Sequence, residues 1–277
     1  MISAGIDVGG KNMHIVNMKE GKVVAKGAGP TGIQKAQAAE KLYDEILAKA
    51  GLKRSDVQQV VATGSAGKRV AFAGGYIPDA AADARGINKL YPSVRTVIDV
   101  GAEEGRSIKV SPKGKVLDFT VNEKCAAGTG TFTEAMARAL EIPVEEMAKL
   151  SMTSTKSIPM NAQCAVFGES EVVSLIHQKM PKPDIARAVH DAIAGRVASV
   201  ARIVGLEKDL AMVGGMAKNA GFVDSLKRDT GMDIIVPQDP DYVGALGAAV
   251  AAAAGVTTAE EIKAKVLEKE TVSDGKA

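Results

Sequence analysis

Ile6-Asp7-Val8-Gly9-Gly10 decides the fold of this 277-residue chain, because the chain repeats it as Ile98-Asp99-Val100-Gly101-Ala102. Each copy ends a hydrophobic strand in a tight turn. A second strand and a hairpin turn follow, at Lys19-Glu20-Gly21-Lys22 and at Pro112-Lys113-Gly114-Lys115. The offset is 92 residues from Asp7 to Asp99 and 93 from Gly21 to Gly114. This repeat predicts two matching β-meanders.

Each copy continues into a helical pattern and a later apolar strand that ends in glycine, at residues 59–64 and 210–215. A duplicated β-β-β-α-β-α unit is therefore expected. We place one subdomain at residues 1–92 plus about 243–277 and the other at 93–242, with the junction near Pro92-Ser93. Apolar spacing and glycine stops predict helices at residues 33–50, 79–90, 130–140, 144–150, 166–178, 184–204, 220–230, 244–254 and 259–269.

The composition is that of an ordinary soluble globular protein with an aliphatic core. Hydrophobic residues make up 46% and charged residues 25%, and the formal net charge of +2 gives no strong attraction to nucleic acid or a membrane surface. Aromatic residues are only 3%, so stacking platforms for nucleobases are not expected. The chain opens on a strand-like segment without a basic and apolar leader, so we expect a cytoplasmic location.

Three glycine turns carry the pattern of a nucleotide site. Glycines let backbone N–H groups approach phosphate oxygens, and an aspartate at the turn can hold Mg²⁺ through water. The two repeated turns could clasp a triphosphate from opposite sides, and a third turn before a helix suits adenosine and the α-phosphate. Each turn could instead be purely structural, as we expect for Thr63-Gly64-Ser65-Ala66-Gly67. The candidate residues are Asp7, Gly9, Gly10, Lys11, Asp99, Gly101, Ala102, Gly214, Gly215, Met216 and Asn219.

The two cysteines both precede helical segments. Cys125 stands before Ala126-Ala127-Gly128-Thr129-Gly130, and Cys164 opens the run from Ala165 to Val172. The positive end of a helix favours an anionic ligand, and two thiolates are half of what an iron–sulfur cluster needs. A Cys125–Cys164 disulfide is the alternative, although a reducing cytoplasm disfavours it.

The order of these turns on a duplicated unit resembles the actin, Hsp70 and sugar-kinase superfamily, whose fold is a two-domain, ribonuclease H-like α/β ATPase. Three segments, at residues 124–130, 163–172 and 243–249, resemble one branch within it. That branch, the BadF/BadG/BcrA/BcrD ATPase family, comprises the ATP-dependent activators of 2-hydroxyacyl-CoA dehydratases and the ATPase subunits of benzoyl-CoA reductase. The resemblance covers roughly residues 2–255.

The resemblance implies a set of cofactors and partners. Two homologous subunits would share one [4Fe–4S] cluster, with Cys125 and Cys164 as this chain's ligands and ATP with Mg²⁺ as the nucleotide. Gly128 and Thr129 would join the nucleotide-binding residues. The implied partners are a homologous ATPase subunit, the catalytic subunits that bind acyl-CoA, and ferredoxin as the electron donor.

The loop Gly101-Ala102-Glu103-Glu104-Gly105-Arg106 bears on the choice within the family. The activators tend to have Gly-Gly-Gln-Asp at this position, whereas the sequence of this loop looks more like that of the D (delta) subunit of benzoyl-CoA reductase. Glu103 or Glu104 would then replace the residue that orients the attacking water. We therefore expect an electron-transfer subunit for the dearomatising reduction of an aromatic acyl-CoA. The alternatives are a homodimeric dehydratase activator, a small-molecule kinase of the same superfold and a filament-forming actin relative.

Overall fold

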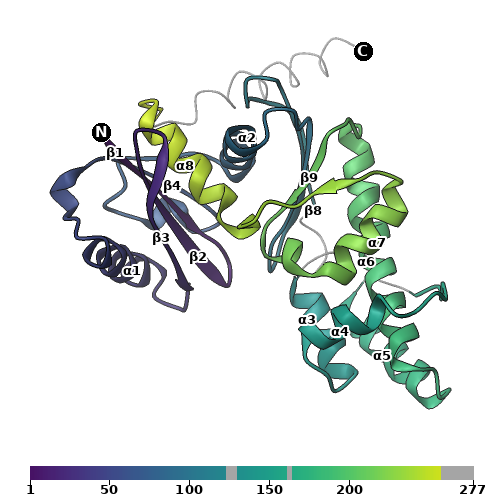
Figure 1. Cartoon of the computed structure of the whole chain (residues 1–277). Helices are drawn as coiled ribbons and strands as arrows, with labels where there is room; N and C mark the ends of the chain where they lie inside the picture. Colours follow the sequence, from purple (N-terminus) through teal and green to yellow (C-terminus); the bar gives the residue numbers. More distant parts are fainter. Residues whose placement is uncertain (123–129, 161–163, 257–277) are drawn as a thin grey trace, which may run out of the picture. The chain divides into compact units, whose positions relative to one another are not determined.

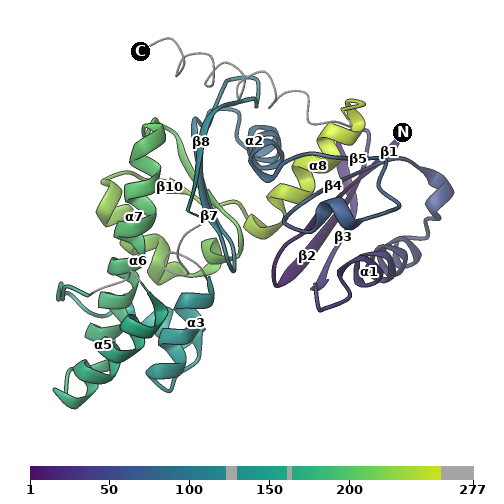
Figure 2. The same cartoon turned by 180° about the vertical axis from the view of Figure 1, so that it is seen from behind.

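The computed structural model describes residues 1–122, 130–160 and 164–256 and separates into two compact units (Figures 1 and 2). The first unit takes Met1–Ala82 and the chain from Gly244 onward, and the second takes Asp83–Val243. Helix α2 (Asp79–Leu90) runs from one unit into the next. The subdomain bounds expected from the sequence stay a prediction.

The first unit is built on a five-stranded sheet in the order β3-β2-β1-β4-β5. Its first three strands form an antiparallel meander, and β4 and β5 extend the sheet in parallel from β1. Glu20 and Gly21 both have positive φ, as a two-residue hairpin between β2 and β3 requires. The strands are β1 (Ile2–Val8), β2 (Asn12–Lys19), β3 (Lys22–Pro30), β4 (Val57–Thr63) and β5 (Gly75–Tyr76).

The alternation of side chains along β1 explains how helices cover both faces of this sheet. Ala4, Ile6 and Val8 point to one face, where they form a core with α1 (Lys35–Lys49). Gly5 points to the other face, against the backbone of α8 (Val243–Ala253). The sheet therefore lies between two helical layers, as Figure 1 shows. Single-turn helices complete the unit at Arg54–Asp56 (η1) and Gly67–Arg69 (η2).

The second unit repeats the same sheet, in the order β10-β9-β6-β7-β8. Strands β6, β7 and β8 form the second antiparallel meander, and β9 and β10 extend it in parallel from β6. Each strand therefore has a counterpart in the first unit. The strands are β6 (Thr96–Val100), β7 (Gly105–Val110), β8 (Val116–Asn122), β9 (Leu210–Val213) and β10 (Ile234–Ile235).

The second unit carries more helices than the first between its third and fourth strands. Where the first unit has α1, the second has four helices, and their apolar faces form one core with β6, β9 and α7. The helices are α3 (Gly130–Ala139), α4 (Val144–Ser151), α5 (Ala165–His177), α6 (Lys182–Val204) and α7 (Ala220–Thr230), with single-turn helices η3 (Gly215–Lys218) and η4 (Pro240–Tyr242).

The expected duplicated fold is confirmed. The helices expected at residues 79–90 and 220–230 have those bounds, and the other expected helices within the described residues are present with ends shifted by one or two residues. The helix expected at 259–269 lies outside the described residues. Over the part of the chain that the structure describes, no helix is long and apolar enough to cross a membrane.

Candidate nucleotide turns and cluster ligand

The first repeated turn is fixed by backbone hydrogen bonds. The Gly9 N–H donates to the carbonyl of Asn12 over 3.1 Å, and the buried Thr31 bonds the same loop twice. Its hydroxyl donates to the Gly9 carbonyl over 3.0 Å, and its N–H donates to the Lys11 carbonyl over 2.9 Å. The backbone of this turn is therefore held in one shape before any ligand arrives.

A glycine at the end of the neighbouring strand leaves room for the Asp7 carboxylate. Gly64 follows β4 with φ of +90°, and a Cβ added there would collide with Asp7 Oδ1 and the Val8 carbonyl. Thr63, which pairs with Asp7 in the sheet, is buried. The turn at Gly64, expected to be structural, thus contacts a candidate catalytic residue directly.

The second unit builds the same arrangement around Asp99. The Gly101 N–H donates to the Glu104 carbonyl over 2.9 Å, as Gly9 does to Asn12. Gly214 follows β9 with φ of +82°, and a Cβ there would collide with Asp99 Oδ1. Each aspartate therefore lies against a glycine that no side chain can replace without moving the carboxylate.

Arg106 gathers three carboxylates around the second turn, all within the second unit. Its guanidinium lies 3.2 Å from Asp99 Oδ2, 2.8 Å from Glu104 Oε2 and 3.9 Å from Asp83 Oδ2. The Arg106 and Asp99 side chains are only 11% and 14% exposed. Glu104, a candidate for orienting water, is thus engaged by Arg106, whereas Glu103 is exposed. Arg106 directly opposes Asp99 across the β6–β7 pair, and no motif along the chain indicates this pairing of charges.

The third turn, after β9, is held by one hydrogen bond to η4 and one within the turn. The Gly214 N–H donates to the Pro240 carbonyl over 2.9 Å, and the Asn219 N–H donates to the Met216 carbonyl over 3.0 Å. The Met216 side chain is buried in the core of the second unit, so it is committed to packing. A Cβ on Gly215 would meet nothing within 4 Å, which leaves its backbone approachable.

Asn219 links this turn to a buried histidine. Its side-chain oxygen accepts a hydrogen bond from the Phe222 N–H over 3.0 Å, as an N-cap of α7. The amide nitrogen must then donate to His190 Nε2, 3.1 Å away, so Nε2 carries no proton. Burial lowers the pKa of His190 to about 4. No sequence pattern indicates this contact, because it depends on how α6 and α7 pack.

The first residues of α3 are bonded to the second repeated turn. The Gly130 N–H donates to the Gly101 carbonyl over 2.9 Å, and the Thr131 N–H donates to the Ala102 carbonyl over 3.0 Å. The Thr131 hydroxyl also bonds that carbonyl. Cys125, Gly128 and Thr129 lie outside the described residues, just before this helix.

Cys164 is the N-cap residue of the thirteen-residue helix α5. Its thiol is free and half-buried, and no acidic residue in the first helical turn offsets the positive helix end. The position suits a thiolate that ligates an anionic iron–sulfur cluster. Within the described residues, no three His, Cys, Asp or Glu side chains are grouped so that they could hold a metal ion.

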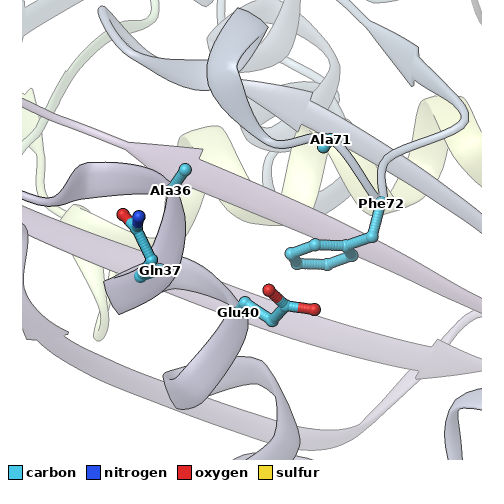
Figure 3. A pocket seen from close by; sticks show the side chains of 5 residues that line it. All are labelled: Ala36, Gln37, Glu40, Ala71 and Phe72. Carbon is cyan, nitrogen blue, oxygen red and sulfur yellow. The ribbon is translucent and has the colours of Figure 1, made fainter.

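A hollow of about 400 Å³ lies in the first unit between α1 and the segment after η2 (Figure 3). None of the candidate site residues lines it. Phe72 and Glu40 do, and the Arg54 guanidinium engages both, 5.1 Å over the Phe72 ring and 3.0 Å from the Glu40 carboxylate. The other lining residues are Ala36, Gln37 and Ala71.

Comparison with known proteins identifies relatives over nearly the whole chain. Residues 4–252 match the sequence model of the BadF/BadG/BcrA/BcrD ATPase family. The activator of lactoyl-CoA dehydratase from Anaerotignum propionicum is 40% identical over 256 residues, which are 90% of this chain and 96% of the relative. The structure of the activator of the 2-hydroxyisocaproyl-CoA dehydratase from Clostridium difficile with bound ADPNP matches with a TM-score of 0.84 and 34% identity, over 98% of each chain.

The similarity to benzoyl-CoA reductase is less extensive. The D subunit of that enzyme from Thauera aromatica is 34% identical over 218 residues, which are 76% of this chain and 77% of the relative. The preference for a reductase component, drawn from the loop at residues 101–106, is therefore the less well supported reading. Its alternative, a dehydratase activator, is better supported because activators match a larger share of the chain.

Proposed function

The chain belongs to the BadF/BadG/BcrA/BcrD ATPase family, and from this premise we propose that it is the ATP-hydrolysing activator of a 2-hydroxyacyl-CoA dehydratase. In this role it delivers a low-potential electron to the dehydratase. The observation that carries the proposal is the similarity, over nine-tenths of the chain, to the activator of lactoyl-CoA dehydratase. In this proposal the acyl-CoA binds the dehydratase, so the dehydratase and not this chain selects the substrate.

The turns supply the nucleotide chemistry in this proposal. In each unit the turn beside the closing hydrogen bonds offers backbone N–H groups, such as those of Gly10 and Ala102, to phosphate oxygens, and an aspartate, Asp7 or Asp99, that can hold Mg²⁺ directly or through water. The turn at Gly214 and Gly215 contacts the nucleoside side of the ligand. Gly214 and the hydrogen-bonded backbone of the turn keep Asp99 at the end of β6, which limits the reorganisation that hydrolysis requires.

The two cysteines supply the ligands of a cluster in this proposal. When bound, a [4Fe–4S] cluster supplies one-electron transfer at low potential. Cys164 presents its thiolate at the positive end of α5, and a second chain contributes the other pair of thiolates. Ferredoxin is the proposed reductant.

The backbone bonds of α3 give this proposal a route from nucleotide to cluster. Gly130 and Thr131 donate to the carbonyls of Gly101 and Ala102, so a shift of this turn on hydrolysis moves the start of α3. Cys125 lies five residues before Gly130 in the sequence. A change at the phosphates thus reaches a cluster ligand through a few residues of backbone.

Anaerobic purification followed by iron analysis and an activation assay tests the proposal. We expect about four iron atoms per two chains, ATP hydrolysis, and ATP-dependent activation of a 2-hydroxyacyl-CoA dehydratase by reduced ferredoxin. Iron-free protein whose ADP production depends on an added sugar or other small alcohol would instead indicate a kinase. Protein that hydrolyses ATP but never activates a dehydratase would contradict the activator role.

A benzoyl-CoA reductase component remains the second candidate, because the sequence of the loop at residues 101–106 resembles that of the reductase subunit. Co-expression with a second ATPase subunit and a catalytic pair distinguishes the two. ATP-dependent reduction of benzoyl-CoA by the assembled complex, with no activation of a dehydratase by this chain alone, would favour this candidate.

Replacing Cys164 by Ala tests the ligand assignment separately. Iron content should fall to background because the shared cluster loses two of its four thiolates, one from each copy, while the dissociation constant for ADP stays within about twofold. Ser170→Ala, on the same helix, is the matched control and should keep its iron. Full iron content in Cys164→Ala would reject Cys164 as a ligand.

A further inference from the structure

Arg106 occupies the position next to Asp99 where a cation would be expected. Its guanidinium lies 3.2 Å from Asp99 Oδ2, and both side chains are largely buried. We propose that Arg106 is a positioning residue that acts as the resident counter-ion of Asp99. It holds this carboxylate in place without nucleotide and lowers the affinity of the site for free divalent cations. The inference rests on the proposed ATPase function, because it takes Asp99 as the carboxylate that faces Mg²⁺.

The local charge supports this role. Asp83, Asp99 and Glu104 bring three negative charges within 4 Å of a single guanidinium. With Arg106 present the group carries a net charge of minus two, and without it minus three. Because a divalent cation is attracted more strongly to the larger negative charge, loss of Arg106 should raise the affinity for free cations even while it loosens Asp99.

The residue type and its burial also fit a resident counter-ion. A guanidinium stays protonated at any physiological pH and can engage several carboxylates at once through its planar fork. Asp83 is almost fully buried, so its charge always needs a partner, whereas Glu104 is 45% exposed and can turn to solvent. Arg106 can therefore yield Asp99 to Mg²⁺ when the nucleotide brings the metal with its phosphates, and still remain paired with Asp83.

Manganese binding to the anaerobically purified protein with its cluster tests the inference. Free Mn²⁺ is measured by electron paramagnetic resonance without nucleotide, in the wild type, in Arg106→Gln and in Arg106→Lys. We expect Arg106→Gln to bind Mn²⁺ about tenfold more tightly, and Arg106→Lys, which keeps the charge, to stay within about twofold of the wild type. Arg202→Gln, which breaks an exposed ion pair to Asp229 in the same unit, is the matched control and should leave Mn²⁺ binding unchanged.

The dependence on Asp99 separates this role from a structural one. In an Asp99→Asn background, Arg106→Gln should no longer tighten Mn²⁺ binding. Unchanged or weaker Mn²⁺ binding in folded Arg106→Gln would overturn the inference. If Arg106→Gln does not fold, Glu104→Gln decides. Removal of this exposed carboxylate lowers the negative charge and leaves Arg106 on Asp99, so Mn²⁺ binding should weaken about tenfold, and unchanged binding would overturn the inference.

Measurements on the wild-type protein alone test the proposed ATPase function. If the wild type binds no ADP in the presence of Mg²⁺, as measured by calorimetry, the proposed ATPase function fails. If it binds ADP and hydrolyses ATP while Arg106→Gln leaves Mn²⁺ binding unchanged, only the role of Arg106 fails. The two failures are therefore distinguishable.

Discussion

His190 shows how a single buried side chain ties the stability of the second unit to pH. Burial lowers its pKa from 6.5 in the unfolded chain to about 4 in the folded chain. As the pH falls below about 6.5 the unfolded chain takes up a proton that the folded chain refuses, so stability is lost on acidification until the pH reaches about 4. This one group should cost about 2 kcal/mol between pH 7 and pH 5.

His190→Gln removes this titration and can still accept a hydrogen bond from Asn219. Urea unfolding at pH 7 and pH 5 should therefore show a smaller loss of stability for this variant than for the wild type, by about 2 kcal/mol. His177→Gln, which changes the exposed histidine at the end of α5, is the control and should lose as much as the wild type. An equal loss in His190→Gln and the wild type would mean that His190 is not held neutral.

Single residues also mark the limit of prediction from the sequence. A repeated motif identifies Asp7 and Asp99 as candidates without any knowledge of packing. Arg106 and His190 were not found, because their partners are brought near by strand pairing and by the contact between α6 and α7. A pattern read along the chain reports which residues recur, and it does not report which charges become neighbours after burial.

Among the elements, the contact between β1 and α8 in the first unit depends on a glycine. A Cβ on Gly5 would collide with the backbone of α8 at Ala245 and Ala249, and backbone cannot move aside as a flexible side chain can. Gly5→Ala should therefore lower the free energy of unfolding by about 3 kcal/mol, measured by urea denaturation.

The same sheet offers a matched control for Gly5→Ala. A Cβ on Gly29 in β3 would meet only the Leu42 side chain, at 3.4 Å or more, which is ordinary contact. Gly29→Ala should change stability by less than about 1 kcal/mol. If the two variants proved equally stable, the close approach of α8 to β1 would not be a tight contact in solution.

The elements that could be predicted are those with a strong local signal. The two meanders follow from the repeated turns, and long amphipathic helices such as α6 follow from their apolar spacing. The two-residue strands β5 and β10 could not be predicted, because a pattern of period two cannot be recognised in two residues. The parallel pairing of β1 with β4 depends on a chain reversal through α1, so no local pattern along the chain predicts it.

In the molecule as a whole, the duplicated parts and the added helices carry different candidate sites. The duplicated sheets give each unit an aspartate at the end of its first strand and a positive-φ glycine against it. The second unit adds α3, α4 and α5, and the chain places Cys125 just before α3 and Cys164 just before α5. The parts that have a counterpart in the other unit therefore suit the nucleotide, and the added part suits electron transfer.

Assembly of the whole molecule should depend on the cluster. This chain offers two thiolates and a cluster needs four, so the proposed activator must pair with a second copy. The first turn of α5, beside Cys164, exposes Val166 and Phe167 at 67% and 65%, an apolar surface that pairing could cover. Under anaerobic conditions, sedimentation should therefore give a mass of about twice 28.6 kDa.

Removal of the cluster provides the decisive comparison for this assembly. After iron is chelated, the mass should fall to 28.6 kDa while ADP binding persists, because the nucleotide turns lie in each chain and the shared thiolates do not contribute to them. A chain that stays at 28.6 kDa with full anaerobic handling, and pairs only when a second ATPase subunit is supplied, would favour the reductase candidate. A pair that survives complete loss of iron would mean that protein contacts, and not a shared cluster, hold the two copies together.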